Sequence, residues 1–592
     1  MCEPTTFAPT TYAPTTFEPT TYAPTTFALS IVNRNYTEYE FINTHNSQKD
    51  IHCINPNPLE QKLFHKDIID KDGKVLRSPY RENETIPGVL ILAGNTYGHV
   101  NGNLKGKLLY KCLPDAKHLP AFLIPYEDKT PTFTKQKVNK YITFRIKDWV
   151  SKHPVGILTH TLGNVDDTES FYQYQIYCKG LQHSLSALNK ATATTTTATT
   201  TQKQLIYEIG LKSAVEDRRL MEVFSIDPAG SKDVDDAIGI TTTEAGQIIL
   251  SIYIANVALV LDYLNLWPHL SKRVSTIYLP TGKIPMLATV LSEDLCSLLA
   301  KVDRVAYCMD ITLDGAYNLE TIDFKRVLIN VRANYVYEEA NLLAQPAYQR
   351  ILHITQHLNK HYRFVGSVDD SHQVVEFYMI FMNFESSKKL LERKRGIFRI
   401  TTEINSEEAS ASVSVPVSLP SEFSSFLNAF NNQHIRGSYC AFDPRAGHAL
   451  IGPGLPSYTH ITSPIRRLVD LINLIIMQPE YLTETALQFA QTWCANIAVI
   501  NTDMKNIKKV QTTCDLFALY LKDGPKQYSG LVFNRSECRA DFYKFSVYIP
   551  ALKMVTTLKT GEKLQNYTVV KVSTHVFYAE DNIKKKIRVQ LN

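Results

Sequence analysis

Four aspartates crowd into one short loop between two segments that the sequence predicts to be buried strands. The stretch "SIDPAGSKDVDDAIGI" (225–240) carries these carboxylates between the strand-like "VFSID" and "DAIGITTT". Like charges this close repel each other, so folding them together costs free energy unless a positive partner lies among them. A sheet must therefore pin both ends of the loop, and a cation must meet its aspartates: Asp227, Asp233, Asp235 and Asp236.

Hard divalent cations are the first candidates for that positive partner. Mg2+ takes oxygen ligands, usually one or two carboxylates together with substrate phosphate, and two such ions can clamp a phosphodiester. Three other interpretations stay open. The EF-hand spacing is absent, which argues against a calcium loop, and the apolar flanks argue against an acidic surface turn. Turn capping would explain one or two of the aspartates.

A second segment, "YTHITSPIRRLVDLIN", places two arginines beside a predicted helix start. Ser463 and Pro464 suit the N-cap and the first helical position, so we expect the helix to begin there. Arg466 and Arg467 would then lie in the first turn, where the helix dipole disfavours cations unless an anion binds. Either Arg466 binds phosphate, or it pairs with Asp470 four residues later.

The texture of the sequence changes along its 592 residues, which are too many for a single core. A unit of the form PTT(F/Y)A repeats over residues 4–28, and a proline at every fifth position excludes helix and sheet there. Short apolar runs broken by Gly, Pro and Asn predict small β-barrels at both ends of the chain. We expect a disordered repeat tail at 1–30, a partial first barrel at 31–85, a second barrel at 86–188, a threonine-rich linker at 189–204, a central α+β body at 205–522 and a final barrel at 523–592.

Within the central body, strands give way to helices after the aspartate loop. Apolar residues recur there at spacings of three and four, which is the period of an amphipathic helix. The helices are predicted over four ranges: 347–362, 374–394, 463–477 and 485–521.

The composition of the chain indicates in which compartment the protein works but says little about which reaction it performs. The net charge of +5 is small for this length and only mildly favours a polyanionic partner. None of the 10 cysteines forms a C-x-x-C pair, which fits a reducing compartment. No secretory signal is visible, and the longest apolar run (468–477) is too short to span a membrane. We expect a soluble, monomeric, intracellular protein of the cytoplasm, with the nucleus as the alternative; the repeat tail is a candidate for docking protein partners.

Four ordered segments resemble the signatures of the ribonuclease II/R (RNB) exoribonucleases. "SIDPAGSKDVDDA" and "YTHITSPIRRLVDLI" resemble the two main signatures of that family. Between them, "STIYLPTGKIPMLATVLSEDLCSLLAKVDRVA" and "VVEFYMIFMNF" resemble two further family segments in the same order. The flanking barrels resemble, more faintly, the cold-shock and OB barrels of the branch that includes the exosome's catalytic subunit, without a PIN domain in front.

The resemblance implies a multidomain protein with N-terminal OB/cold-shock-like β-barrels, a central α+β RNB catalytic domain and a C-terminal OB-fold β-barrel. It implies hydrolytic 3'-to-5' degradation of single-stranded RNA to nucleoside 5'-monophosphates with Mg2+, for which Mn2+ can substitute. A catalytically inactive RNA-binding regulator on the same scaffold is the alternative. Members without activity usually lose signature aspartates, and all four are present here.

The same resemblance assigns roles to individual positions. Asp227, Asp233, Asp235 and Asp236 match the metal-holding aspartates, and Asp235 matches the one closest to the catalytic step. Arg466 matches the arginine that stabilises charge on the scissile phosphate. RNA contacts are implied for six residues: Tyr278 on a base, Tyr337 and Glu376 near the ribose, and Thr462, Ser463 and Arg467 in the second signature.

Other positions depart from the family pattern and put the shape of the RNA channel in doubt. Phe364 is a weak candidate for a second base-stacking aromatic, whereas His448 and His460 are expected to be structural histidines. The departures are Tyr253, Asn256 and Leu474.

Overall fold

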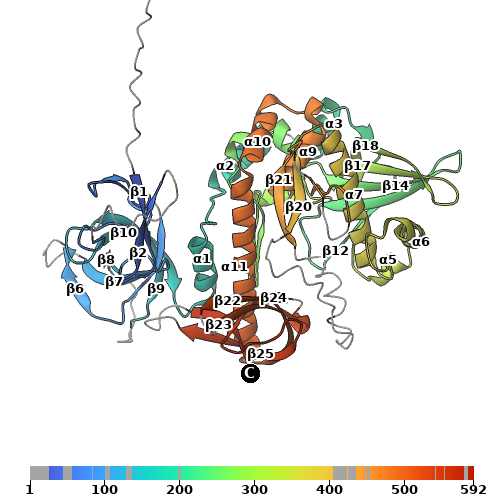
Figure 1. Cartoon of the computed structure of the whole chain (residues 1–592). Coiled ribbons are helices and arrows are strands. Elements are labelled where there is room, and N and C mark those ends of the chain that lie inside the picture. The colour runs from blue at the N-terminus through green and yellow to red at the C-terminus, as the bar shows by residue number, and fades with distance from the viewer. Residues whose placement is uncertain are drawn as a thin grey trace, which may run out of the picture. The chain divides into compact units, whose positions relative to one another are not determined.

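The computed structural model forms two compact units, Met1–Cys178 and Lys179–Asn592 (Figure 1). The described residues are 26–44, 57–82, 85–100, 107–127, 137–197, 202–403, 423, 435–445, 447–449, 454–539, 542–552, 554–578 and 585–592. The predicted repeat tail falls largely on residues 1–25, outside these ranges. Its predicted end at residue 30 is wrong, because Thr26–Ile31 forms strand β1 and buries Phe27 and Leu29.

The N-terminal unit contains a five-stranded barrel of the OB-like kind. Strand β5 pairs with both β9 and β7, so the order β5-β9-β10-β8-β7 closes on itself, and β6 extends the sheet beside β7. Helix α1 (Thr168–Cys178) follows the last strand. The strands are β5 (Ile86–Leu90), β6 (Thr96–His99), β7 (Leu108–Pro114), β8 (Phe122–Tyr126), β9 (Lys140–Asp148) and β10 (Val155–Asn164).

A smaller sheet precedes this barrel and shares its core. Its strand order is β2-β1-β3-β4, and it stands where the sequence predicts a partial barrel. Phe64 lies parallel to Phe122 of the five-stranded barrel, with ring centroids 6.1 Å apart, and contacts Trp149 as well. Burial of such rings joins the two sheets through one hydrophobic core. The four strands are β1, β2 (Tyr39–Asn43), β3 (Ile68–Asp70) and β4 (Val75–Arg77).

A seven-stranded mixed sheet forms the frame of the C-terminal unit. Its order is β11-β18-β17-β14-β13-β12-β19, and long apolar strands such as β14 are buried along nearly their whole length. Residues buried on both faces of a sheet read as continuous apolar runs, as "IILSIYIA" does. The strands are β11 (Glu216–Asp217), β12 (Val223–Asp227), β13 (Asp236–Thr242), β14 (Ile248–Ala255), β17 (Asp303–Leu313), β18 (Leu319–Asn330) and β19 (Ala333–Val336).

Helices form at the four predicted places, with two differences. Helix α9 begins at Leu468 rather than at Ser463, and the range predicted as one helix over 485–521 forms two, α10 and α11. Helices α2 to α5 were not predicted, and α2 (186–197) overlaps the predicted threonine-rich linker at 189–204. The threonines of α2 fit a helix because Thr192 donates its hydroxyl to the Leu188 carbonyl, 2.8 Å away. The helices are α2 (Ser186–Thr197), α3 (Gln202–Lys212), α4 (Val257–Tyr263), α5 (Ala340–Leu343), α6 (Pro346–Tyr362), α7 (Ser371–Glu392), α9 (Leu468–Met477), α10 (Glu484–Ala495) and α11 (Ile497–Asp523).

A second closed barrel ends the chain. Helix α11 leads directly into it (Figure 1), and Leu519 packs against its core. The alternating strands predicted at the C-terminus close in the order β22-β23-β24-β26-β25, so the predicted arrangement of barrels around an α+β body is confirmed. The strands are β22 (Gln527–Arg539), β23 (Phe542–Ile549), β24 (Met554–Thr560), β25 (Val569–Tyr578) and β26 (Lys585–Leu591).

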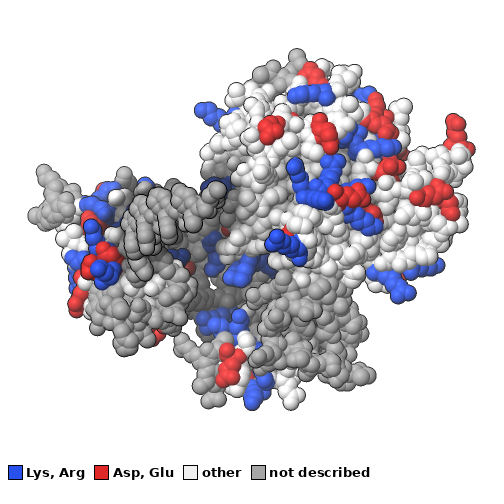
Figure 2. Space-filling model, turned by 45° about the horizontal axis from the view of Figure 1, so that its top comes forward, with Lys and Arg blue, Asp and Glu red and all other residues white. Residues whose placement is uncertain are grey.

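On the face shown in Figure 2, Lys and Arg side chains lie interspersed with Asp and Glu side chains. Neither the small net charge nor the distribution of charge on this face therefore identifies a binding surface. Within the part of the chain that the structure describes, no helix is both long and apolar enough to cross a membrane.

Candidate active site

The loop between β12 and β13 brings all four aspartates to one end of the large sheet. Asp227 is the last residue of β12 and Asp236 the first of β13, so the sheet pins both ends of the loop as predicted. Strand β19 runs parallel to β12 on its other side, and the amide of Tyr337 donates to the Asp227 carbonyl, 3.3 Å away. The aspartates therefore lie beside the chain segment that carries Tyr337.

Asp235 is the most deeply buried of the four, with 2% of its surface exposed. Its Oδ1 accepts from the Ile465 amide at 2.9 Å, and its Oδ2 lies 2.9 Å from the Arg466 Nε. Burial raises the pKa of Asp235 to about 7, although Arg466 acts in the opposite direction. This carboxyl group is therefore poised to exchange a proton near neutral pH.

The raised pKa of Asp235 predicts a pH-dependent stability. The folded protein holds the proton more tightly than the unfolded chain, whose aspartates titrate near about pH 4. The stability from this group is therefore full at low pH and falls as the pH rises toward about 7, by roughly 1.4 kcal/mol for each unit of raised pKa. Denaturant unfolding of the metal-free protein from pH 5 to pH 8 should show this fall in wild type and a shallower one in Asp235→Asn. Parallel curves would contradict the assignment.

Asp227 and Asp236 add to the unfavourable charge. The Oδ2 atom of Asp227 is buried without a hydrogen-bond partner, and burial raises the pKa of this group. Burial also raises the pKa of Asp236, and the charges of Asp227 and Asp235 raise it further. The repulsion that the sequence predicts is therefore present in the fold.

Two basic side chains from distant segments supply the positive charge. Arg466 pairs with Asp235, and the Nζ of Lys283 lies 2.7 Å from Asp233 Oδ1 and 3.0 Å from Glu293 Oε1. Lys283 comes from β16 (Gly282–Ile284), which pairs with β15 (Ile277–Leu279) in a short hairpin. Nothing in the sequence pattern pointed to Lys283, because its partner stands 50 residues earlier in the chain.

The segment "YTHITSPIRRLVDLIN", which carries the second family signature, does not form the predicted helix start at Ser463. Ser463 and Pro464 begin a tight turn, not a helix, and Arg467 is extended, with φ −140° and ψ 122°. Residues 466–468 instead lie against residues 274–276: the Thr276 amide donates to the Arg466 carbonyl at 2.9 Å, and the Leu468 amide to the Val274 carbonyl at 2.9 Å. This non-local pairing overrides the local Ser-Pro signal.

Arg466 and Arg467 point to different partners. The side chain of Arg466 is 46% exposed beside the aspartates, so it is accessible to a substrate. Arg467 instead binds Asp470 through its Nε and Nη2 atoms, with Nη2 2.8 Å from Oδ1. The alternative pairing of Arg466 with Asp470 is therefore wrong, because Arg467 takes that place.

The remaining second-signature residues are buried supports. The Ser463 amide donates to Asp470 Oδ1 at 2.9 Å, and its hydroxyl accepts from Arg466 Nη2 at 3.2 Å. Thr462 is 4% exposed. That Thr462, Ser463 and Arg467 contact RNA stays a prediction. The contacts that the structure shows for Ser463 and Arg467 are with other residues of the protein.

Two tyrosines stand at the edges of the aspartate site. Tyr278 lies on the β15–β16 hairpin with 40% of its surface exposed, and burial of the remainder raises the pKa of its phenol while nearby Arg466 lowers it. Burial, with the charges of Asp236 and Asp227, raises the pKa of Tyr337 to about 12. Both phenols are therefore neutral hydrogen-bonding groups beside the carboxylates.

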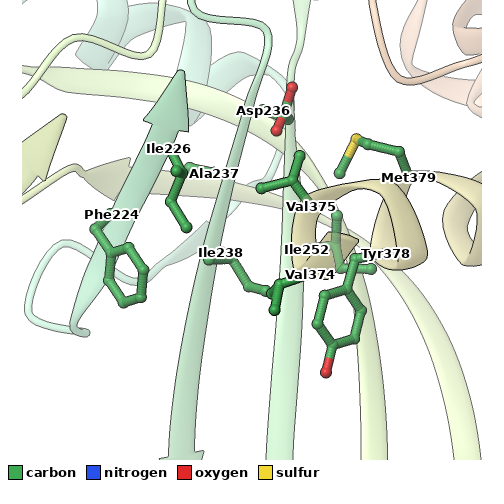
Figure 3. Close-up of a pocket in the computed structure, with 10 residues that line it drawn as sticks. All are labelled: Phe224, Ile226, Asp236, Ala237, Ile238, Ile252, Val374, Val375, Tyr378 and Met379. Carbon is green, nitrogen blue, oxygen red and sulfur yellow. The ribbon is translucent and has the colours of Figure 1, made fainter. Parts of the chain in front are cut away.

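Helix α7 closes the site on the side of Asp236. Figure 3 shows Asp236 at the end of β13 with Val375 and Met379 of α7 beside it, above a small pocket lined by apolar side chains. Glu376, exposed on the same helix, lies one turn after His372. The ring of His372 stacks on Tyr337 with centroids 3.7 Å apart and planes 10° apart. Sequence reasoning missed His372, although its spacing of four from Glu376 places both on one helix face.

The departures from the family pattern are accommodated in the core. Asn256 caps α4 through the Leu259 amide and exchanges two hydrogen bonds with Gln478. Tyr253 and Leu474 are almost fully buried. Phe364 packs among aromatic residues of α6 and α7, which leaves the second base-stacking residue unassigned.

The two histidines are structural, as expected. His460 is buried, with its Nδ1 2.7 Å from the Tyr439 hydroxyl. His448 accepts from the Asp443 amide at 3.2 Å and stacks on Phe442.

The donor set fits a hard divalent cation. The four aspartates of the loop offer carboxylate oxygens, and one of them, Asp227 Oδ2, is buried without a hydrogen-bond partner. Across the described ranges, no three His, Cys, Asp or Glu side chains are gathered closely enough to hold a metal ion as they stand. Lys283 and Arg466 occupy the carboxylates of Asp233 and Asp235 instead, so a cation would compete with them.

Comparison with known sequences matches the part of this site that carries the four aspartates, Lys283, Tyr278 and Tyr337. Residues 215–365 match the model of the RNB domain. The chain is 24% identical over 371 residues to ribonuclease R of Chlamydia pneumoniae, covering 52% of this chain and 54% of that protein. It is also 36% identical over 126 residues to the exosome complex exonuclease RRP44 homolog A of Arabidopsis thaliana, covering 21% of this chain and 14% of that protein. The chain thus spans about half the length of the first of these relatives.

Solved structures share the fold over nearly the whole chain. Mycoplasma genitalium RNase R, solved with ribose-methylated single-stranded RNA, superposes with a TM-score of 0.66 at 16% identity, covering 96% of this chain and 100% of that one. Yeast Ssd1, described as a pseudonuclease, superposes with a TM-score of 0.53 at 14% identity, covering 93% and 80%. At these identities the likeness concerns the fold, which an active and an inactive protein have in common.

Proposed function

We propose that the chain is a ribonuclease of the RNB family, because residues 215–365 match the RNB domain. We propose further that it hydrolyses single-stranded RNA from the 3' end to nucleoside 5'-monophosphates. The observation that carries this proposal is the pairing of buried Asp235 with half-exposed Arg466. These residues are 231 positions apart in the chain and meet where all four aspartates converge. The RNA bound to the similar RNase R structure supports the choice of substrate.

The side chains divide the work by their chemistry. Arg466 offers a guanidinium suited to the scissile phosphate, and the exposed ring of Tyr278 offers a stacking surface for a base. Tyr337 and Glu376 flank the position proposed for the ribose. Asp227, Asp233, Asp235 and Asp236 would hold Mg2+, or Mn2+ in its place. When bound, such an ion lowers the pKa of a water and stabilises charge on phosphate.

An RNA-binding regulator without catalysis is the second candidate. It is favoured by the pairing of Lys283 with Asp233 and of Arg466 with Asp235, which neutralises much of the aspartate charge without a metal. The observed arrangement of the carboxylates is compatible with both the exonuclease and the regulator, so only a measurement of cleavage distinguishes the two functions.

The test is a time course on 5'-labelled single-stranded RNA with Mg2+. We expect a ladder that shortens from the 3' end, and no such ladder on DNA of equal sequence. Intact RNA with binding retained would favour the regulator instead.

We propose the cytoplasm as the place of action. Cys296, Cys308, Cys440 and Cys494 carry free thiols, which fits a reducing compartment. The monomeric state and the docking of partners on the N-terminal repeat stay predictions.

Replacing Lys283 should strengthen metal binding. In wild type a cation must break the Lys283–Asp233 pair, which is largely buried, with side chains 22% and 13% exposed. A pair of this kind is worth about 1 kcal/mol, so Lys283→Met should bind Mn2+ roughly fivefold to tenfold more tightly. The affinity is measured by titrating the RNA-free protein with Mn2+ and monitoring the loss of the electron paramagnetic resonance signal of free Mn2+.

Lys360→Met is the matched control, because Lys360 is exposed at the end of α6, away from the aspartates. Its Mn2+ affinity should equal that of wild type. Equal affinity of Lys283→Met and wild type would show that Lys283 does not compete with the metal.

A further inference from the structure

We propose that His372 is a specificity-determining residue that positions Tyr337 so that the site recognises the ribose of the terminal nucleotide. The proposal rests on the proposed function and adds a residue that the family signatures do not contain. Its basis is the ring stack between His372 and Tyr337 and the way the chain holds both residues in place.

The turn that carries Tyr337 is locked to the start of α7. Glu338 has φ +58°, a left-handed conformation that costs free energy for a residue other than glycine. Three hydrogen bonds with Ser371 hold it: Glu338 Oε1 accepts from the Ser371 amide (2.7 Å) and hydroxyl (2.6 Å), and the Glu338 amide donates to the Ser371 hydroxyl (3.0 Å). These bonds also lower the pKa of Glu338, so its carboxylate stays ionised at neutral pH and keeps its hydrogen bonds to Ser371.

The start of α7 is itself rigid. Asp370 accepts from the Gln373 amide at 2.9 Å, and the Gln373 side chain accepts from the Asp370 amide at 3.0 Å, which completes a capping box. His372 lies inside this capped turn. Its backbone is therefore fixed, and only its ring has freedom left to lose.

The stack defines which part of Tyr337 a substrate can reach. Rings 3.7 Å apart and nearly parallel cover one another, so His372 occupies one face of the Tyr337 ring. The other side of the residue is anchored through its amide to Asp227. With the ring held on one face and the main chain held at its amide, the phenol edge is fixed in place, and its neutral hydroxyl donates and accepts hydrogen bonds.

A ribose 2'-hydroxyl is the substrate group that such an edge can recognise. It both donates and accepts hydrogen bonds, and it distinguishes RNA from DNA. Glu376 follows His372 by one helical turn, so a carboxylate acceptor lies on the same helix face as the stack. Displacement of a positioned group by about 1 Å is enough to weaken such recognition markedly.

The experiment measures binding, so it does not depend on turnover. In the Asp235→Asn background, two otherwise identical RNA strands are compared, one ending in a ribonucleotide and the other in a 2'-deoxynucleotide. We expect the parent protein to prefer the ribo end, and His372→Ala to reduce that preference by about threefold to tenfold. His372→Phe keeps a flat ring and should keep most of the preference.

His353→Ala is the matched control. His353 makes a ring contact with Tyr317, at 5.6 Å between centroids, on a different part of the same unit. It should leave the preference unchanged, and thermal unfolding of all variants separates loss of fold from loss of positioning. An unchanged preference in His372→Ala, or no preference in the parent protein, would overturn the proposal.

Cleavage by the wild-type protein decides the proposed function separately. A preference that depends on His372, together with no cleavage, would support this inference and overturn the exonuclease in favour of the regulator.

Discussion

Replacing Asp235 with Asn should lower turnover on single-stranded RNA by about a hundredfold or more, the range seen when one central electrostatic group is removed from an active site. The substitution keeps an oxygen that can accept from the Ile465 amide, so the local fold should persist. It removes the negative charge that faces Arg466 and the basic oxygens offered to a metal. Binding of RNA should change little, because Arg466 and Tyr278 remain.

Single-turnover cleavage and filter binding on the same RNA measure the two quantities. A fall in cleavage with unchanged affinity is the expected result. Full activity of the variant would exclude Asp235 from catalysis, and loss of binding alone would make it a substrate-binding residue.

Replacing Asp470 with Ala should destabilise the protein by about 3–5 kcal/mol, the usual cost of leaving one member of a buried ion pair alone. Asp470 is fully buried, accepts from Nε and Nη2 of the Arg467 guanidinium and also accepts from the Ser463 amide. All three donors would lose their partner at once. The turn that presents Arg466 would lose its support, so activity should fall as well.

Urea unfolding gives the free energy of unfolding for wild type, Asp470→Ala and Asp470→Asn. The Asn variant keeps an acceptor for the Ser463 amide and should lie between the other two. Asp235→Asn serves as the contrast, because it should reduce activity without this loss of stability. A stability of Asp470→Ala within 1 kcal/mol of wild type would show that the pair is not needed for the fold.

Local sequence signals predicted most elements but not the pairings between distant segments. The periodicity over 347–362 and 374–394 predicted α6 and α7 well, because their apolar faces are buried as the spacing requires. The Ser-Pro signal at 463 failed because residues 466–468 pair with 274–276, and nothing local encodes that contact. The prediction of a linker in the threonine-rich segment failed for another reason. In helix α2 the threonine hydroxyls donate hydrogen bonds to carbonyl groups of the same helix.

In the candidate active site, too, local sequence signals succeeded, whereas contacts between distant segments could not be predicted. The aspartates and Arg466 were predicted together because two signatures name them, and the fold does bring Arg466 to Asp235. Lys283 was missed because its role depends on the hairpin that carries it across to Asp233. His372 could have been found, since its helical spacing from Glu376 was legible in the sequence.

The main-chain pairing of residues 274–276 with 466–468 has a mechanical consequence. It joins Arg466 to the strand that leads, two residues later, to the hairpin bearing Tyr278. Because the two segments are joined through main-chain hydrogen bonds, substituting a side chain in either segment leaves the pairing itself in place. Under the proposed function, inserting or deleting one residue between this pairing and the hairpin would therefore shift Tyr278 relative to Arg466, whereas exchanging side chains would not.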